Sequence, residues 1–412
     1  MIDKIIELID FYADPKRALS QKIKVTGNKL YINGFNFDLG NRALVVSFGK
    51  CAFKMAKWAQ ENLKFEQGIL VRPLNDVEGK LDEFIEIRST HPNISDKSIE
   101  AAKLIEEEVK RNYSSILFLI SGGSSALVED PLIDLDDMII LNELLIKSGA
   151  SIHEINTVRK HLSKVKGGKL ALLCKAKFIT LAVSDVPFDE PSIIGSGPTY
   201  PDSSTFKDAY EVLLAKKVWQ ELPERVKRFI LRGIEKEIEE TPKNFLSPYF
   251  IILRNRDVLN ALAKEFKKLN PLILTSWAQG ESREIAKLFS RIFQENEENK
   301  ALIMGGEPDV TVRGKGRGGR NSEFVLSFLK NMYKVNEFYI LAYATDGLDG
   351  NSNAAGAWGD EKTLHEIQEK GIEVEKELND NNTAFVMEKV NKLIVRGITG
   401  NNVNNVYLAL KN

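Results

Sequence analysis

The chain has 412 residues, of which 43% are hydrophobic and 28% are charged, and its formal net charge is -1. This length and composition are typical of a globular protein with two or three domains, and the balanced charge excludes a general attraction to nucleic acid or anionic lipid. Two cysteines, Cys51 and Cys174, are too few for a disulfide framework or a zinc cage, and they fit a reducing compartment.

The first stretch of the chain, residues 1–19, places acidic residues inside an apolar pattern. This pattern predicts an amphipathic helix and not a signal peptide. Because no run is long and uncharged enough to cross a membrane, we expect a cytoplasmic protein without a membrane partner.

Short apolar runs rich in β-branched residues alternate with helical patterns along the first half. Strands are predicted at 43–49, 84–89, 115–123 and 178–187, and Ser95 is a candidate N-cap of the helix that follows the second strand. The alternation predicts a mostly parallel sheet covered by helices, in which ligands bind beyond the carboxyl ends of the strands.

Residues 220–248 form a charged helical segment that ends in prolines, and we interpret it as a connection between two lobes. The α/β alternation resumes beyond it. We therefore expect two α/β lobes with a small-molecule site in the cleft between them.

A glycine- and serine-rich loop, SGGSSALVEDP at 121–131, follows the third predicted strand. Its amides and hydroxyls could converge on a phosphate, although it is neither a Walker A loop nor a GxGxxG fingerprint. A tight turn between strand and helix is the alternative.

Two acidic loops also lie at predicted strand ends. The first, 184–202, contains Asp185 and Asp189 as candidate Mg²⁺ ligands, and also Gly197. The second, 345–360, contains Asp346, which could be a ligand, a base or a turn former.

Residues 313–323 read RGKGRGGRNSE, a pattern shared by disordered RNA-binding tails and ordered anion-binding loops. A predicted strand before it and a predicted helix after it favour an ordered loop whose basic groups and glycine amides bind an oxyanion. Lys50, at the start of the helix after the first strand, is a second candidate phosphate ligand. His153 and His161 lie on a predicted helix, and we expect them to be structural or surface residues.

Several segments together resemble one known family. They are FGKCAFKMA, SGGSSALVEDP, INTVRKHLSKVKGGKLA, SDVPFDEPSIIGSGPTYPD, GGEPDVTVRGKGRGGRNSEF, ATDGLDGNSNAAGA and TGNNVNNV, in this order along the chain. They are similar to the signatures of the class II glycerate 2-kinases, which carry a C-terminal MOFRL domain. The sequence departs from the pattern at Ser124, at Phe188 and at Asn353, where the family usually has glycine, glycine and aspartate.

The resemblance implies ATP- and Mg²⁺-dependent phosphorylation of D-glycerate to 2-phosphoglycerate, with other divalent cations as alternatives. It also implies an N-terminal Rossmann-like three-layer α/β/α domain and a C-terminal α/β domain with an active site between them. We place these domains at 1–235 and 236–412, with the MOFRL region at about 300–410. The family's active-site lysine falls on Lys50 and its arginine on Arg320.

The remaining roles are hypotheses. Asp189 is a candidate catalytic residue, with Asp346 as an alternative base, and metal ligands are expected among Asp185, Asp189 and Asp346. Nucleotide-binding residues are expected to be Ser121, Gly122, Gly123, Ser124, Ser125, Gly197 and Lys315.

The alternatives are an NAD(P)H-dependent hydroxypyruvate reductase, which the lack of a GxGxxG after the first strand disfavours, and a kinase of a related hydroxy acid. A nucleic-acid partner is not expected. The assembly state is left open, with a homodimer as one option.

Overall fold

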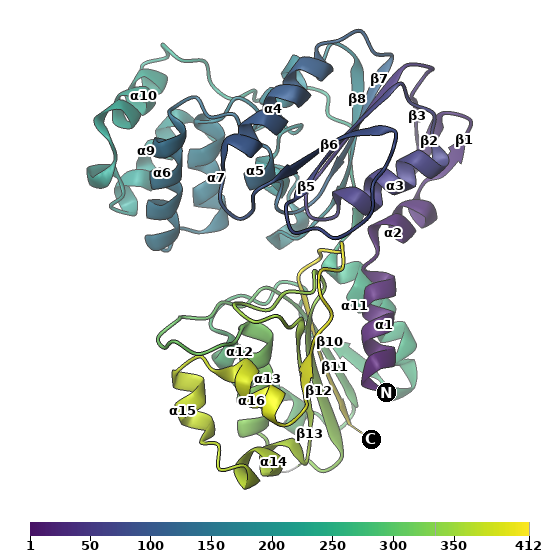
Figure 1. Ribbon diagram of the computed structural model, residues 1–412, viewed down its shortest axis with the longest axis vertical. Coiled ribbons are helices and arrows are strands. Elements are labelled where there is room, and N and C mark those ends of the chain that lie inside the picture. The colour runs from purple at the N-terminus through teal and green to yellow at the C-terminus, as the bar shows by residue number, and fades with distance from the viewer. Residues whose placement is uncertain (334, 412) are drawn as a thin grey trace. The chain divides into compact units, whose positions relative to one another are not determined.

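The computed structural model describes residues 1–333 and 335–411. They form two compact units (Figure 1). The N-terminal unit is Ala18–Ile252, and the C-terminal unit is Leu253–Asn412 together with Met1–Arg17. None of the described helices is long and apolar enough to cross a membrane.

The N-terminal unit is built on a six-stranded sheet with the order β6-β5-β4-β7-β8-β9, in which the pairs from β6 to β8 are parallel. Every residue of β4 and β7 is buried, because both faces of a parallel sheet are covered. The strands are β4 (Ala43–Phe48), β5 (Gln67–Pro73), β6 (Phe84–Ser89), β7 (Ser115–Ile120), β8 (Lys177–Val183) and β9 (Tyr249–Leu253). These bounds confirm the four predicted strands, with shifts of a few residues at the ends.

Helices cover this sheet and form a separate cluster beside it. The predicted cap is confirmed, since Ser95 Oγ accepts a hydrogen bond from the Lys97 amide at the start of α4. The helices are α2 (Pro15–Lys22), α3 (Ala52–Asn62), α4 (Asp96–Val109), α5 (Ser124–Leu127), α6 (Leu135–Lys147), α7 (Ile152–His161), α8 (Lys169–Leu173), α9 (Phe206–Ala215) and α10 (Glu224–Ile234). Short 3₁₀ turns are η1 (Pro187–Asp189), η2 (Ile194–Ser196) and η3 (Trp219–Glu221).

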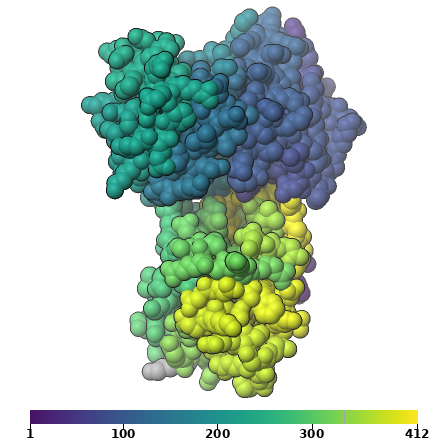
Figure 2. All heavy atoms as spheres, turned by 60° about the vertical axis from the view of Figure 1, so that its left-hand side comes forward, coloured from purple at the N-terminus to yellow at the C-terminus, as the bar shows by residue number. Residues whose placement is uncertain are grey.

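Two hydrophobic cores hold the N-terminal unit together. One lies between the sheet and its helices, and the other lies within the cluster of α6, α7, α9 and α10. The segment of α9 and α10, teal in Figure 2, forms one end of this unit. A three-stranded antiparallel sheet, β1 (Lys24–Thr26), β2 (Lys29–Ile32) and β3 (Phe35–Asp38), completes the unit.

The expected division after residue 235 differs from the division in the structure, which falls after Ile252. The segment before Ile252 stays with the N-terminal unit because Thr241 donates to Asp202 at 2.9 Å and the Thr180 amide donates to the Pro248 carbonyl at 2.9 Å. The interpretation of 220–248 as a connection between lobes is therefore wrong, since α10 buries its apolar face in the second core.

The C-terminal unit contains a mixed six-stranded sheet with the order β10-β11-β15-β12-β13-β14, in which only β10 and β11 pair in parallel among the described strands. The strands are β10 (Pro271–Ile273), β11 (Ala301–Gly306), β12 (Phe338–Ala344), β13 (Gly356–Asp360), β14 (Leu393–Ile394) and β15 (Asn405–Lys411).

Figure 1 shows α11 and α1 on one face of this sheet and α12, α13 and α16 on the other. The first helix joins this unit because Asp10 accepts a hydrogen bond from the Tyr343 hydroxyl at 2.7 Å and pairs with Arg396 at 2.9 Å. The helices are α1 (Ile2–Tyr12), α11 (Asn255–Glu265), η4 (Lys267–Leu269), α12 (Ser282–Glu295), α13 (Arg320–Lys330), α14 (Thr363–Glu369), α15 (Val374–Asn379) and α16 (Thr383–Lys389).

A glycine inside α10 tests the packing of the helical cluster. A Cβ added at Gly233 would lie 2.3 Å from the ring of Phe206, although helix propensity alone favours alanine by about 1 kcal/mol. We expect Gly233→Ala to lower the free energy of unfolding by about 1–3 kcal/mol in urea titrations. The exposed Arg232→Ala in the same helix should change it by less than about 0.5 kcal/mol. A Gly233→Ala variant more stable than the wild type would contradict this packing.

Candidate functional site

The candidate site of the N-terminal unit lies where β4 and β7 end. The chain runs outward from β4 through β5 to β6, and then returns to the other side of β4 with β7 and β8. The edge between β4 and β7 is therefore the topological switch point, where open α/β sheets bind their ligands.

Lys50 and the loop after β7 are held together at this edge. The Lys50 amide donates to the Gly122 carbonyl at 2.9 Å, and the Cys51 amide donates to Ser121 Oγ at 3.0 Å. Gly49 is required here because its φ is +125° and an added Cβ would lie 2.2 Å from Ser121 Oγ. The sequence-predicted Lys50, Ser121 and Gly122 are thus neighbours in the structure.

Gly123 brings two further side chains to the same place. An added Cβ would lie 3.1 Å from His91 Cδ2 and 3.2 Å from Lys50 Cγ. The aliphatic part of Lys50, the His91 ring and the glycine backbone therefore meet at one point. From the sequence, His91 was expected only to follow a strand and to be able to reach the cleft.

The serines of this loop fix its shape. Ser124 Oγ donates to the Ser121 and Phe48 carbonyls, and Ser125 Oγ lies 2.7 Å from Ser196 Oγ. In contrast, the backbone amides of residues 122–125 have no hydrogen-bond acceptor within the described part of the chain. Such a set of open amides on a glycine-rich loop can bind the oxygens of a phosphate.

Gly197 lies behind this loop. It adopts a φ of +61°, and its carbonyl accepts a hydrogen bond from the Gly168 amide at 2.7 Å. Its neighbour Ser196 touches Ser125, so the segment around Gly197 supports the loop.

A cavity of about 310 Å³ opens beside the loop after β7. Its polar lining residues are His91, Asn93, Gly123, Ser125, Glu129, Asn142, Glu143 and Arg159. The remaining wall is apolar and consists of Pro92, Ile94, Ala126, Ile139, Ile146, Ile152 and Ile155.

A buried ion pair borders this cavity. Glu129 pairs with Lys166, and Glu129 also accepts a hydrogen bond from Ser163 Oγ at 2.5 Å. Burial lowers the pKa of Lys166, and the Glu129 carboxylate opposes this shift by stabilising the ammonium. The sequence analysis missed Glu129, Lys166 and Arg159. For Arg159 the available signal was that α7 places charged residues among core positions such as Ile155 and Val158.

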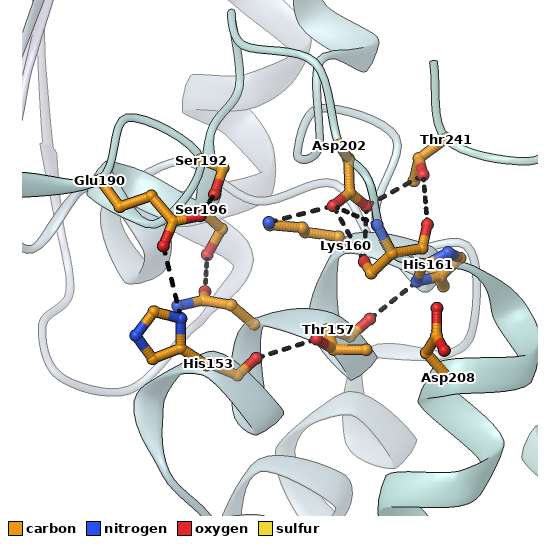
Figure 3. Close-up of polar contacts among 12 residues, drawn as sticks. His153, Thr157, Lys160, His161, Glu190, Ser192, Ser196, Asp202, Asp208 and Thr241 are labelled. Atoms are coloured by element: carbon orange, nitrogen blue, oxygen red, sulfur yellow. Dashed lines mark hydrogen bonds and ion pairs between the residues drawn. The ribbon is translucent and has the colours of Figure 1, made fainter. Parts of the chain in front are cut away.

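Figure 3 shows a second buried network that starts on α7. Lys160 lies 3.2 Å from Asp202, which also accepts hydrogen bonds from the hydroxyls of Ser204 and Thr241 at 2.9 Å. Desolvation would raise the pKa of Asp202, but Lys160 and these donors lower it overall. The contacts of Asp202 therefore indicate a structural role.

His161 belongs to the same network and is fully buried (Figure 3). Its Nδ1 lies 2.7 Å from the Thr157 carbonyl and its Nε2 lies 3.1 Å from Glu240 Oε2. The expectation of a structural role for His161 is confirmed. Glu190 of the acidic loop lies 3.6 Å from His153, whose side chain is half-exposed.

The predicted acids follow β8. Burial chiefly, and Asp185 to a smaller extent, raise the pKa of the Cys51 thiol to about 12, which places this carboxylate near the Lys50 turn. Asp189 has a φ of +53° and follows Phe188, whose φ is +61° and whose side chain is 68% exposed. A phenylalanine thus occupies a left-handed position that favours glycine.

No group of three or more metal-binding side chains converges within the described residues. Mg²⁺ commonly uses one or two carboxylates and completes its shell with water and substrate phosphates. A carboxylate such as Asp185 fits that donor set.

In the C-terminal unit, Arg320 is the first residue of α13. Its guanidinium pairs with Glu307 at 2.7 Å, and its carbonyl accepts a hydrogen bond from Ser282 Oγ at 2.6 Å. The next amides, of Asn321 and Ser322, donate to the buried carboxylate of Asp349 at 2.9 and 3.0 Å. The anion at this helix N-terminus is therefore Asp349 itself.

The basic loop before α13 is ordered, as predicted, but its amides do not face solvent. The Arg313 and Gly314 amides donate to Asn381, and the Lys315 amide donates to Asp380 at 3.1 Å. An added Cβ at any of its four glycines would lie 2.2–2.5 Å from the facing residues, so the glycines allow close packing. The expectation that the glycine amides bind an oxyanion is therefore wrong. The basic side chains remain as the groups of this loop that could bind an anion.

The other predicted residues of this unit lie on the surface or at a turn. Lys315 is exposed. Asp346 is half-buried and accepts a hydrogen bond from the Leu348 amide at 3.1 Å, as a turn former does.

Glu240 gives the network around His161 a pH dependence. Burial would raise its pKa, but hydrogen bonds from His161 and the Phe206 amide lower it from 4.5 to about 2. A depressed carboxyl pKa stabilises the fold above about pH 4.5, and this contribution is lost as the pH falls toward about 2. Glu240→Gln should therefore reduce the melting temperature at pH 6, and its difference from the wild type should shrink below pH 4. The exposed Glu239→Gln serves as control, and a pH-independent difference for Glu240→Gln would contradict this origin.

Two family models match the chain. A domain of unknown function, DUF4147, matches residues 5–231, and the MOFRL family matches residues 300–405. The chain is 39% identical to a glycerate 2-kinase from Pyrococcus horikoshii, over 97% of this chain and 94% of that protein. It is 33% identical to a putative hydroxypyruvate reductase from Agrobacterium vitis, over 89% and 86%.

A solved structure agrees with these relatives. The crystal structure of a glycerate kinase from Thermotoga maritima matches with a TM-score of 0.84 at 35% identity, over 99% of this chain and 98% of that one. The two-unit fold, the sequence signatures and the full-length similarity lead to one conclusion: the chain belongs to the glycerate 2-kinase family with a MOFRL domain.

Proposed function

We propose that this protein transfers the γ-phosphoryl group of ATP to the 2-hydroxyl of D-glycerate, giving 2-phosphoglycerate and ADP. The observation that carries the proposal is the junction of Lys50 with the open amides of residues 122–125 at the switch point of the sheet. Membership of the glycerate 2-kinase family supports the choice of substrates.

Phosphoryl transfer depends on positioning and on neutralising charge. In this proposal the amides of residues 122–125 hold phosphate oxygens, while Ser121 and Ser124 keep the loop in shape through their bonds to the backbone. The stem of Lys50 lies against Gly123 in the same loop. In this proposal its ammonium group therefore neutralises charge on the transferred phosphoryl group.

Arg320 is proposed to bind the transferred phosphoryl group through its guanidinium, which suits a bidentate contact with phosphate. Its pairing with Glu307 orients the side chain. Lys315 is proposed as an exposed secondary contact for the nucleotide phosphates.

The proposed acids divide the remaining roles. As the 2-hydroxyl oxygen forms a bond to the γ-phosphorus, the bond from phosphorus to the ADP oxygen breaks, and Asp189 accepts the hydroxyl proton. Asp346 is the alternative base. Asp185, Asp189 and Asp346 are the candidate carboxylates for Mg²⁺, which when bound would neutralise phosphate charge.

A cytoplasmic location belongs to the same proposal. It is supported by Cys51 and Cys174, which are unpaired thiols in the structure, as is usual in a reducing compartment.

The reductase alternative rests on the name of the Agrobacterium relative. The turn after β4 reads Gly49-Lys50-Cys51-Ala52 and lacks the glycine pattern that binds a dinucleotide. Oxidation of NADH by hydroxypyruvate in the absence of ATP would favour the reductase, whereas ADP formed with D-glycerate favours the kinase.

Substitutions test the two basic residues with matched controls. Lys50→Ala and Arg320→Ala should each lower kcat by on the order of 10²-fold or more, because each removes charge stabilisation of the transition state. The controls are Lys54→Ala, on the helix that follows Lys50, and Arg313→Ala, on the loop that precedes Arg320. The product is identified as 2- or 3-phosphoglycerate by phosphorus NMR. A variant with near-normal turnover would remove that residue from the mechanism, and the absence of any phosphoglycerate from the wild type would refute the function.

A further inference from the structure

The cavity of about 310 Å³ beside the loop after β7 shares Gly123 and Ser125 with the phosphate contacts proposed above, but its other lining residues have no role in them. It lies wholly within the N-terminal unit. Its volume is at the lower end of the range of small-molecule sites, and it combines a mostly apolar wall with a few polar groups, as ligand sites do.

Arg159 is the lining residue with unused hydrogen-bonding capacity. Its Nε donates to Asn142 Oδ1 at 2.6 Å, and its terminal nitrogens have no acceptor within the described part of the chain. Burial lowers the pKa of Arg159, which expresses the cost of a guanidinium removed from water. A half-buried guanidinium with no ion-pair partner among the described residues can bind an anionic ligand.

The neighbouring charges do not supply that partner. Glu129, the nearest buried carboxylate that affects Arg159, forms its ion pair with Lys166 and accepts the Ser163 hydroxyl. Glu143 at the rim lies 3.3 Å from Lys147, and both side chains are exposed. Glu129 and Glu143 therefore each have another cationic partner, and neither forms an ion pair with Arg159.

The cavity adjoins the proposed transfer site through the loop after β7. Gly123 lines the cavity and also contacts the stem of Lys50. Ser125 joins the loop to α7, because its hydroxyl lies 2.7 Å from Ser196 Oγ, which donates to Asn156 Oδ1 at 2.5 Å. Arg159 follows Asn156 by one turn of α7, so the loop and this guanidinium are fixed to each other.

We propose that the cavity is the acceptor subsite and that the terminal nitrogens of Arg159 bind the carboxylate of the hydroxy acid. This inference rests on the proposed kinase function and assigns its acceptor. The planar guanidinium presents two parallel donors that match a carboxylate. The isoleucine wall lowers the local dielectric, which strengthens this pairing. In this assignment Arg320 binds the phosphoryl group and not the carboxylate of the acceptor.

Steady-state kinetics with D-glycerate and ATP varied separately test this assignment. We expect Arg159→Met to raise the KM for D-glycerate by about 100-fold or more, because it removes a desolvated charge pair with the acceptor, and to change the KM for ATP by less than about threefold. Arg159→Lys, which keeps the charge and the fold, should still raise the KM for D-glycerate by about 10-fold, because the bidentate geometry is lost. The control Lys147→Met removes an exposed charge at the rim and should leave both KM values unchanged.

An acceptor without a carboxylate separates binding from general damage. With glycerol as acceptor, Arg159→Met should retain the wild-type kcat/KM, so its preference for D-glycerate over glycerol should fall about 100-fold or more. A KM for D-glycerate within threefold of the wild type in both Arg159 variants would overturn the assignment while leaving the kinase function intact. An equal loss with glycerol and D-glycerate would also overturn it. Wild-type protein that phosphorylates no D-glycerate would instead refute the function.

Discussion

The close contact between the turn after β4 and the loop after β7 is the constraint on which the candidate site depends. A backbone hydrogen bond from the Lys50 amide to the Gly122 carbonyl and a hydrogen bond from the Cys51 amide to Ser121 Oγ join two segments far apart in the sequence. The contact needs glycine at position 49, because any larger residue would collide with Ser121. It also leaves the amides of residues 122–125 open, and the cavity with Arg159 lies directly beside them.

In the C-terminal unit, close backbone packing at glycines has a different consequence. Glycines again allow close backbone packing, but there the amides of the basic loop are satisfied by residues 380–382 and by Asn351. Asp349 caps α13. Burial raises the pKa of its carboxyl group, although the hydrogen bonds that it accepts from the Asn321 and Ser322 amides oppose this shift. A glycine-rich basic sequence thus builds a rigid support for Arg320, and the charge that reaches solvent comes from side chains.

Much of the architecture could be predicted from local sequence, because strand periodicity and helix capping are local properties. The strands β4, β6, β7 and β8, the Ser95 cap and the order of the basic loop are examples. The sequence also predicted that Lys50 follows the first strand of this sheet. It did not reveal that Glu129 pairs with Lys166, or that Arg159 borders a cavity, because those partners are set by tertiary packing.

The unit boundary was missed for a similar reason. Thr241 and Glu240 read as parts of a charged connection, yet hydrogen bonds to Asp202 and His161 tie them back to the N-terminal unit. The use of the amides in the basic loop was misjudged because the acceptors of the Gly314, Lys315 and Arg317 amides lie 65–67 residues further along the chain.

One pair of glycines tests the central claim most directly, since both adopt left-handed backbone and differ in what surrounds them. Gly123 has a φ of +83° and faces His91 and Lys50, whereas Gly149 has a φ of +69° and open space around it. Alanine at either position costs roughly 1–2 kcal/mol of backbone strain. If the junction with Lys50 is the site of phosphoryl transfer, Gly123→Ala should lower kcat with D-glycerate by about 10-fold or more, and Gly149→Ala should leave it unchanged. Equal turnover by the two folded variants would contradict the account.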